Sequence, residues 1–585
     1  MNWLKLTCFA LLLIFVGCSK KEQTNEKILK FAVTQEVKGM DPIFANDRYS
    51  SNEVARVYEG LLEYHYLKRP YTLVPNLAEA MPEVSKDGLT YTFKIKKGVL
   101  FHESEAFEGG IGRELVAEDF VYSLKRLSDP KLQGLGWWIL DGKIEGLNQW
   151  REKYSELPVV NYDEEIPGLR AVDSHTLVFK LTKPYPQFLY SLAMPYAFVV
   201  AREVVEKYGA EFLNYPVGTG PFILPRFNQT NRIVYKKNPK FREKFYPTEA
   251  SEEFREAGLT ADAGKRLPLV DGIEVNVIVE SQPRWLNFQK GNVDYIAIPK
   301  DNFDSAVTPD RNLSADFESK GISLLITPAL DITYTAFNHD MPIFKNADLR
   351  RAMSLAYDSE AANTLFYNGT ALAAESVVPP GIAGHIPSYK NPFKGRDLEK
   401  AKELLKKAGF PEGKGLPAFT YDCPNSTIAR QIGEFFKRQM ADIGIQVNVV
   451  TNPWPQLLEK INRRQIQIYG IAWGADYPDA ENFLQLLYGP NRSPGANGSG
   501  YSNPEFDKMY EQAAVMQDSP ERTALYEKLN LLVANDMPWI LGVHRQDFTL
   551  VHSWLKNFVP SDFDSGRAQY LNIDLEQKAE ASKKL

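Results

Sequence analysis

The chain has 585 residues, of which 44% are hydrophobic and 12% aromatic, and its formal net charge is −6. This length excludes a single small domain and supplies enough apolar residues for two or three domains with large cores. The mild acidity is spread along the chain and gives no sign of a nucleic-acid surface, so we expect no nucleic-acid partner. Of the three cysteines, only Cys423 lies outside the first 20 residues, which excludes an internal disulfide framework.

The first residues have the layout of an export signal. Lys5 supplies a positive charge, and residues 6–16 form an apolar run. That run is well short of the roughly 20 residues that a membrane-spanning helix needs. Residues 15–18, Phe-Val-Gly-Cys, resemble the bacterial lipobox, with Phe in place of the usual Leu. The resemblance implies that residues 1–17 are removed and that Cys18 receives a lipid, while ordinary signal cleavage with a free Cys18 is the alternative.

The segment after the export signal predicts a tether and then the first regular elements. Residues 18–27 are polar and charged without apolar periodicity, which is typical of a flexible tether. Residues 28–33, Ile-Leu-Lys-Phe-Ala-Val, predict a first strand, and apolar residues at helical spacing predict a helix within 50–64. Residues 90–95 and 176–181 alternate polar and apolar side chains, which predicts two half-buried antiparallel strands.

Two long helices are predicted in the second half of the chain. In the first, Asp397 can cap the N-terminus of an apolar stripe and Gly409 can end it. The second helix covers residues 426–443 and is followed by a predicted strand at 445–450. Because helices and strands alternate over the whole length, we expect mixed α/β lobes.

Several short motifs are spread along most of the chain. The clearest are residues 40–42 with 57–61, 98–102 with 117–123, 216–222, 288–294, and 337–338 with 349–358. The last of these reads Phe-Asn and then Leu-Arg-Arg-Ala-Met-Ser-Leu-Ala-Tyr-Asp. In this order the motifs resemble the family 5 extracellular solute-binding proteins of bacteria. That group includes the oligopeptide-binding and dipeptide-binding components of ABC importers.

The resemblance implies an α/β fold of the type II periplasmic binding protein kind, in which two lobes close over a ligand. It also implies an extra α/β domain beside the first lobe and two crossings of the chain between the lobes. The predicted division is a signal peptide at 1–17, a lipidated Cys and flexible tether at 18–27, lobe I at 28–63, 185–326 and 545–575, the extra domain at 64–184, and lobe II at 327–544.

Residues 473–479, Trp-Gly-Ala-Asp-Tyr-Pro-Asp, contain the main candidate for ligand binding. In the peptide-binding branch of the family, the Asp of a Trp-x-x-Asp pattern pairs with the α-amino group of the peptide, and Asp476 is the matching position. A carboxylate in a partly dry cleft gains about 1.5–3 kcal/mol from a charge-assisted hydrogen bond to an ammonium group. The resemblance places Trp473 and Tyr477 in the wall of the pocket. A structural turn is the alternative, because Asp-Tyr-Pro-Asp is favourable turn chemistry by itself.

The two ends of a bound peptide raise separate questions. The resemblance implies that backbone groups of Thr34, Gln35, Glu36 and Val37 pair with an extended peptide, which tolerates any side chain of the ligand. Members that select oligopeptides can place an Arg three residues before the Trp to meet the ligand carboxylate. This chain has Gly470 there, so the partner of the carboxylate end stays open.

Other chemistries find little support in the sequence. The seven histidines show no ligand spacing, and we expect neither a metal site nor a cofactor. Residues 218–221, Gly-Thr-Gly-Pro, lack the Lys and the following helix of a phosphate loop and predict a turn. No Gly-x-Ser-x-Gly motif points to a hydrolase, although a scattered triad stays open.

On this resemblance we expect a monomeric substrate-binding lipoprotein of an ABC-type importer and no enzyme. It would capture peptides between its lobes and deliver them to permease subunits. Cys18 would anchor it to the membrane on the periplasmic or extracellular face. One alternative is the same fold and role with a sugar, a metal chelate or another small solute, because a fold alone does not choose the ligand. A less favoured alternative is a secreted enzyme or adhesin on the same scaffold.

Overall fold

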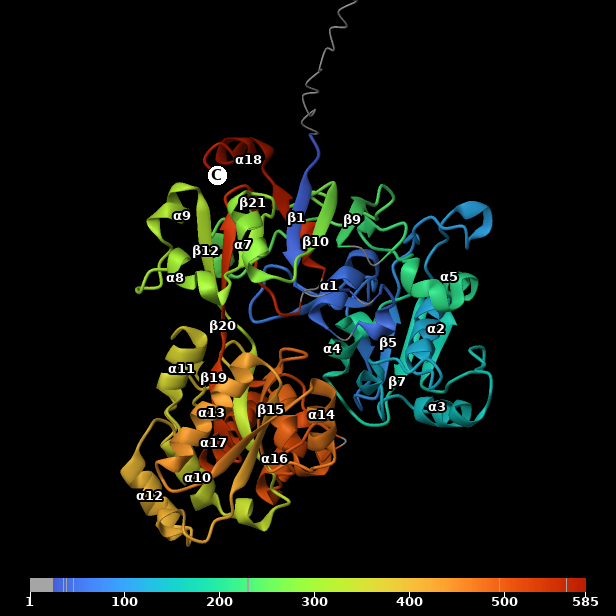
Figure 1. Cartoon of the computed structure of the whole chain (residues 1–585). Coiled ribbons are helices and arrows are strands. Elements are labelled where there is room, and N and C mark those ends of the chain that lie inside the picture. Colours follow the sequence, from blue (N-terminus) through green and yellow to red (C-terminus); the bar gives the residue numbers. More distant parts are fainter. Residues whose placement is uncertain are drawn as a thin grey trace, which may run out of the picture.

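A computed structural model describes residues 25–585, apart from residues 35, 38, 46, 229–230, 494 and 564–565. The predicted signal peptide, Cys18 and most of the predicted tether therefore lie outside the described residues. Two lobes stand one above the other in Figure 1, and a further α/β body lies beside the upper lobe. None of the described helices is both long enough and apolar enough to cross a membrane.

The upper lobe, which we call lobe I, contains two sheets. The first has the strand order β1-β10-β9-β8, with β1 parallel to β10. Its strands are β1 (Ile28–Val33), β10 (Gly272–Val277), β9 (Arg232–Lys237) and β8 (Phe222–Ile223). The second has the order β11-β20-β12, from strands β11 (Tyr295–Ala297), β20 (Gln546–His552) and β12 (Ile322–Pro328). The predicted first strand at 28–33 is confirmed.

The body beside lobe I is built on a four-stranded antiparallel sheet. Its order is β4-β5-β7-β6, from strands β4 (Glu83–Val84), β5 (Thr90–Lys94), β7 (Thr176–Lys180) and β6 (Leu169–Asp173). The two strands predicted near 90 and 176 are confirmed, and they pair directly with each other. Helices α2 (Ala117–Leu127) and α3 (Leu147–Glu156) belong to the same body. One apolar core runs from lobe I into this body without interruption, so burial of apolar surface holds the two together.

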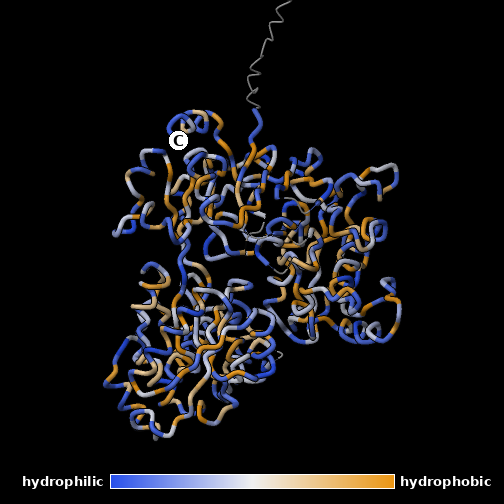
Figure 2. The backbone as a smooth tube through the Cα atoms, viewed as in Figure 1, coloured by the Kyte–Doolittle hydropathy of each residue, from blue (hydrophilic) through white to orange (hydrophobic). Residues whose placement is uncertain are grey.

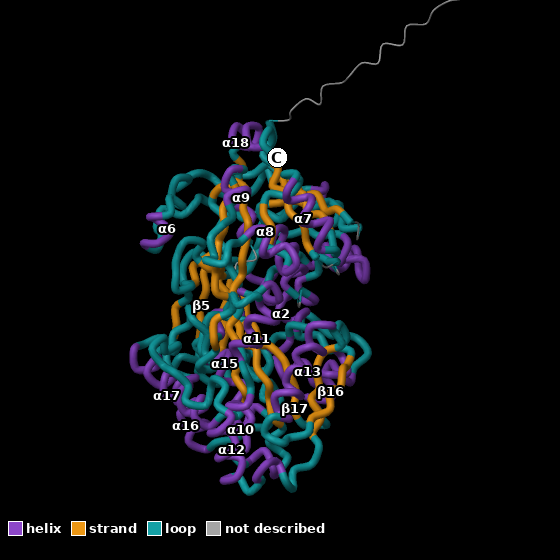
Figure 3. Tube along the Cα trace, turned by 60° about the vertical axis from the view of Figure 1, so that its left-hand side comes forward, coloured by secondary structure: helices purple, strands orange, loops and turns teal. Residues whose placement is uncertain are grey.

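The lower lobe, lobe II, has a mixed five-stranded sheet with helices around it (Figure 3). The order β16-β15-β17-β13-β18 joins strands β16 (Val447–Asn452), β15 (Phe419–Pro424), β17 (Ile468–Gly474), β13 (Asp331–Phe337) and β18 (Trp539–Leu541). Its longer helices are α10 (Ala347–Ala356), α12 (Leu398–Lys407), α13 (Thr427–Ala441), α16 (Pro504–Ala514) and α17 (Pro520–Asp536). Apolar segments run through the interior of both lobes (Figure 2).

Local sequence chemistry accounts for the helix boundaries in lobe II. The side chain of Asp397 accepts a hydrogen bond from the backbone N–H of Lys400, as a capping residue does, and Gly409 ends α12 with φ at +96°. Ser426 caps α13 in the same way. Both predicted helices are confirmed, and the strand predicted at 445–450 begins two residues later, at Val447.

The helix predicted within 50–64 is too long. Helix α1 (Arg48–Val57) ends before the extended residue Tyr58, and strand β2 (Leu62–Tyr64) follows. Two contacts explain the early end. Glu59 is buried and pairs with Arg242 at 2.6 Å, and a Cβ atom on Gly60 would lie 2.9 Å from the ring of Phe198. Both contacts require the chain to leave the helix, and the apolar spacing does not reveal them.

The chain crosses between the lobes twice, at adjacent positions. One crossing joins β12, which ends at Pro328, to β13, which begins at Asp331. The other joins the short strand β19 (Val543–His544) to β20 through Arg545, and Figure 1 shows this run between the lobes. The backbone N–H of Ala329 donates to the carbonyl of Arg545 at 2.9 Å, so the two crossings form one hydrogen-bonded hinge. The predicted residue-by-residue division into domains stays a prediction.

Candidate ligand-binding cleft

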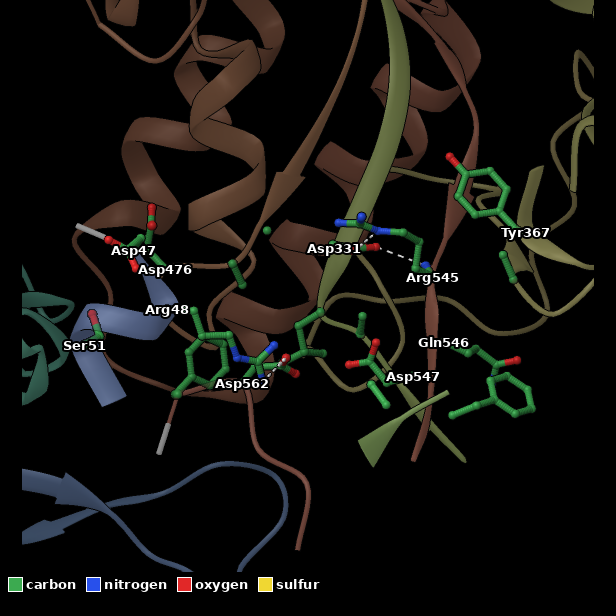
Figure 4. Close-up of a pocket in the computed structure, with 18 of the residues that line it drawn as sticks. Asp47, Arg48, Ser51, Asp331, Tyr367, Asp476, Arg545, Gln546, Asp547 and Asp562 are labelled. Atoms are coloured by element: carbon green, nitrogen blue, oxygen red, sulfur yellow. Dashed lines mark hydrogen bonds and ion pairs between the residues drawn. The ribbon is translucent and has the colours of Figure 1, made fainter. Parts of the chain in front are cut away.

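A cavity of about 730 Å³ lies between the lobes beside the hinge. Lobe I contributes the start of α1 and the start of β20, and lobe II contributes the start of β13 and the turn after β17. Figure 4 shows part of this lining. Among the described residues, its charged members are five carboxylates and three bases: Asp47, Asp331, Asp476, Asp547 and Asp562, with Arg48, Lys300 and Arg545. The excess of acid favours a cationic group in the ligand.

Asp476 is held in this cavity by a residue that the sequence did not single out. Asn482, in the short helix α15 (Glu481–Leu484), is 0% exposed. Its Oδ1 accepts hydrogen bonds from the backbone N–H of Asp476 and from Nε1 of Trp473, both at 3.0 Å. Its Nδ2 donates to Oδ2 of Asp476 at 3.2 Å. A single buried amide therefore fixes the turn and orients the carboxylate.

Within the described part of the chain, the carboxylate of Asp476 has no cation close to it. Among the described residues, no Lys, Arg or His nitrogen lies within 4 Å of it, and its side-chain hydrogen-bond partner is the neutral amide of Asn482. The side chain reaches the solvent of the cavity, yet protein on both sides displaces much of the bulk water around it. This desolvation raises the pKa of Asp476 to about 6, and the hydrogen bond from Asn482 offsets only part of the rise. The charged form is thus less stabilised than at an ordinary surface site.

A place for Trp473 and Tyr477 in the wall of a ligand pocket stays a prediction. Neither lines this cavity, although Gly474, Ala475 and Asp476 do. The indole N–H of Trp473 is used by Asn482. Tyr477 is 2% exposed, because its hydroxyl donates to Glu481 at 2.5 Å and its ring stacks on Tyr190 at a centroid distance of 5.6 Å.

The early segment lies at a neighbouring cavity of about 1130 Å³. Thr34 lines it, and its hydroxyl is hydrogen-bonded to that of Tyr49 at 2.5 Å. Gln35 lies outside the described residues. Glu36 and Val37 do not line either cavity, and Val37 is buried in the core. The two cavities share the lining residues Arg48, Ala297, Leu330, Asp547 and Asp562. They are therefore two parts of one cleft, with Asp476 lining one part and Thr34 the other.

The hinge carries an ion pair that faces the first cavity. Nε of Arg545 donates to Oδ2 of Asp331 at 2.5 Å, and the backbone N–H of Arg545 donates to Oδ1 at 3.0 Å. Asp331 is 4% exposed, and burial raises its pKa although Arg545 opposes the rise. The side chain of Arg545 is 48% exposed. Neither residue stood out in the sequence, because the pair joins positions 214 residues apart.

The turn after β17 continues into a second, buried charge pair. Oδ2 of Asp479 lies 2.9 Å from Nη1 of Arg522, and both side chains are 4% exposed. Burial raises the pKa of Asp479, and Arg522 offsets part of the rise. The adjacent carboxylate of Glu481 accepts hydrogen bonds from the hydroxyls of Tyr477 and Tyr510. These groups satisfy one another within the protein.

Gly470 lies in β17 against the ring of Tyr421. A Cβ atom at this glycine would be 2.0 Å from the hydroxyl oxygen of Tyr421. Tyr421 is buried in the core of lobe II. The position therefore cannot take a side chain without displacing that ring.

Two relatives match this chain over nearly its whole length. Heme-binding protein A of Haemophilus influenzae is 26% identical over 97% of this chain and 98% of its own length. The dipeptide-binding protein of Escherichia coli is 25% identical, over 96% of this chain and 97% of its own length.

Solved structures share the fold at lower sequence identity. The structure of HbpA2 from Haemophilus parasuis has a TM-score of 0.73 at 23% identity and covers 94% of this chain and 100% of its own. DppA from Helicobacter pylori in complex with the peptide STSA has a TM-score of 0.70 at 24% identity, over 93% and 98% of the two chains. A profile described as "Bacterial extracellular solute-binding proteins, family 5 Middle" matches residues 72–495, more than half of the chain. The chain belongs to the family 5 extracellular solute-binding proteins of bacteria.

Proposed function

We propose that this chain captures short peptides by their free amino terminus, with Asp476 as the partner of the ammonium group. The proposal rests on one observation: Asn482 fixes Asp476 in the cleft, and no described residue places a cation within ion-pair distance of Asp476. An ammonium group of a ligand would supply the missing charge and a charge-assisted hydrogen bond. The acidic excess of the cavity lining supports the same polarity.

The proposal includes a carrier role. The lobes close over the peptide at the hinge, and the closed form delivers it to the permease of an ABC importer. The names of relatives as dipeptide-binding and glutathione-binding proteins support a peptide ligand. Lipid attachment at Cys18, a monomeric state, and the predicted division into lobe I, lobe II and an extra domain are parts of the same proposal.

Calorimetry on the full-length chain in mild detergent tests the role of Asp476. A short peptide with a free amino end should bind, and its N-acetylated form should bind poorly. Asp476→Asn should weaken binding of the free form by about 10- to 100-fold, which corresponds to the worth of a charge-assisted hydrogen bond. The substitution should not lower the melting temperature, because the raised pKa shows that the fold disfavours the ionised carboxylate.

Asp316→Asn is the matched control, because Asp316 is an exposed carboxylate paired with Lys320 far from the cavity lining. It should leave the affinity unchanged. If Asp476→Asn also leaves the affinity unchanged, Asp476 does not bind the ligand. Native mass spectrometry of protein purified without refolding addresses the ligand class, since one co-purified non-peptide mass would favour a sugar, a metal chelate or another solute.

A further inference from the structure

We propose that helix α4 (Phe188–Ala193) is a latch that holds the two lobes closed, through Tyr190 and through Gln187 at its N-terminus. Both are positioning residues, because they contact the turn after β17 and its neighbouring helices and line neither cavity. The inference rests on the lobe closure in the proposed function and deepens it. It gives the body beside lobe I a part in the release of the ligand.

Helix α4 is fixed to the body beside lobe I by a buried phenylalanine. Phe188 is 0% exposed. Its ring meets the rings of Tyr91 in β5 and Phe179 in β7 at centroid distances of 5.6 and 5.2 Å. Both strands belong to the four-stranded sheet of that body. Because edge-to-face ring pairs add to the gain from buried apolar surface, α4 moves together with this body.

Tyr190 of α4 joins this body to lobe II through stacked rings. Its ring stacks on Tyr64 of β2 at a centroid distance of 6.3 Å and on Tyr477 at 5.6 Å, with interplanar angles of 14° and 5°. Tyr477 is thereby buried in the apolar core that runs from lobe I into the neighbouring body. Among the described residues, it is the single member of that core from lobe II. Lobe II therefore inserts one side chain into the opposite body.

A polar contact accompanies the stack. Gln187 is 1% exposed. Its side-chain nitrogen donates to the backbone carbonyl of Ala514 in α16 at 3.2 Å, and its side-chain oxygen accepts from Nη2 of Arg522 in α17. Arg522 is the buried partner of Asp479, so this contact reaches the ion pair of the turn. An amide that is buried when two bodies meet loses its water and needs such partners.

The latch and the hinge hold different sides of the first cavity. Ala193, the last residue of α4, lines this cavity together with the hinge residues Asp331 and Arg545. Figure 4 shows Asp476, the neighbour of Tyr477, on the other side of the pocket from Arg545. In Figure 1, α4 lies to the right of the crossing from β19 to β20. Because the chain joins the lobes at the hinge, opening the cleft there must break the stack and the amide contact.

The latch predicts a change in ligand release and none in ligand capture. The ligand enters while the lobes are open, and α4 does not contact Tyr477 in that form. Release requires the lobes to open, which costs the free energy of the latch. A weakened latch should therefore raise the dissociation rate and leave the association rate unchanged. A loss of fold would instead lower the amount of binding-competent protein without changing the dissociation rate.

Stopped-flow tryptophan fluorescence of the full-length chain in mild detergent measures both rates, with trialanine as the probe. Tyr190→Ala should release trialanine about tenfold faster than the wild-type chain, because an aromatic pair and its buried area are lost. Tyr190→Phe keeps the stack and should release trialanine at the wild-type rate. If Tyr190→Ala does not fold, Tyr190→Leu replaces it, since leucine keeps apolar volume without the stack and should still speed release.

Tyr208→Ala is the matched control, because Tyr208 also stacks on a tyrosine, Tyr215 at 4.0 Å, and lines neither cavity. It should leave both rates unchanged. In a chain that carries Tyr477→Ala, the further change Tyr190→Ala should add little to the dissociation rate, because the stack is already lost. Fully additive effects, or an unchanged dissociation rate in Tyr190→Ala, would overturn the latch.

Amide hydrogen exchange without ligand separates the latch from the proposed function. The backbone amides of residues 477–484 should exchange faster in Tyr190→Ala than in Tyr208→Ala, because opening exposes this turn. If trialanine does not bind to the wild-type chain but this difference is seen, the proposed function fails and the latch stands. If trialanine binds and Tyr190→Ala changes neither its release nor the exchange, the latch alone fails. If trialanine does not bind and the exchange is unchanged, both fail.

Discussion

Asp476 and Asp479 belong to one turn, three residues apart, and meet opposite surroundings. Asp479 is buried against Arg522, so its charge is satisfied within the protein. Asp476 faces the cavity, and its side chain accepts a hydrogen bond from the neutral amide of Asn482. The same turn thus places one carboxylate in a buried ion pair and the other at the cavity, where we propose that it meets the ligand. The comparison shows that proximity in sequence does not decide whether an acidic residue is buried in an ion pair or faces a cavity.

The largest expected effect concerns the buried pair of Asp479 and Arg522. Arg522→Met leaves the carboxylate of Asp479 buried without its cation, which should lower the free energy of unfolding by about 3–5 kcal/mol. Urea denaturation without ligand measures the loss. Lys402→Met, at an exposed residue of α12, should change stability little. A loss of less than about 1 kcal/mol in Arg522→Met would mean that Asp479 is satisfied by other groups.

Strand β17 leads into this turn and contains Gly470 and Gly474, whose surroundings also differ. Gly470→Ala places a Cβ against the hydroxyl of Tyr421 and should destabilise the chain by about 1–3 kcal/mol through overpacking. A Cβ at Gly474 meets nothing within 4 Å, so Gly474→Ala should be neutral or stabilise by about 0.4–1 kcal/mol. Thermal unfolding of the two variants side by side checks this. Equal melting temperatures would contradict the crowding at Gly470.

The environment of Asp476 in the cleft predicts a pH dependence of ligand binding. Since the pKa of Asp476 in the free protein is about 6, protons compete with the ligand ammonium below that pH. Affinity should be constant near pH 7 and fall about tenfold at pH 5, because only the ionised carboxylate pairs with the ammonium. Calorimetry between pH 5 and 7 measures this slope. Asp476→Asn should bind weakly and without the slope, and a slope that persists in this variant would assign the titration to another group.

The smallest expected effect concerns the tyrosine between the two carboxylates. Tyr477→Phe keeps the ring stack on Tyr190 and removes the hydrogen bond to Glu481. Unfolding should become easier by about 0.5–1.5 kcal/mol, the usual worth of one hydrogen bond. Peptide affinity should be unchanged, because Tyr477 does not line the cavity. A large loss of affinity would instead support the predicted place of Tyr477 in the binding site.

Sequence reasoning succeeded where the determinants are local. The strand at Ile28–Val33 follows from its apolar pattern, and α12 follows from the cap at Asp397 and the glycine after its end. The place of Asp476 in a cleft followed from a family pattern. Asn482 gave no comparable signal, because a buried amide that orients a turn looks like any polar residue in the sequence.

The missed features depend on tertiary contacts. Helix α1 ends at Val57 because Glu59 meets Arg242, about 180 residues further on. The pair of Asp331 and Arg545 exists only because two crossing strands lie side by side. The burial of Tyr477 depends on its contact with the ring of Tyr190. In each case the partner is remote in sequence, and no local periodicity points to it.

Both described ends of the chain lie at the same end of lobe I, where β1 begins and where the last helix, α18 (Leu575–Ala581), packs (Figure 1). Lys578 of this helix is held by Asp294 at 2.8 Å. Attachment of the protein to a surface near either end therefore immobilises lobe I and leaves lobe II free to move. For a single molecule immobilised in this way, a dye on α12 would report the proposed closing of the lobes as a change of its height above the surface.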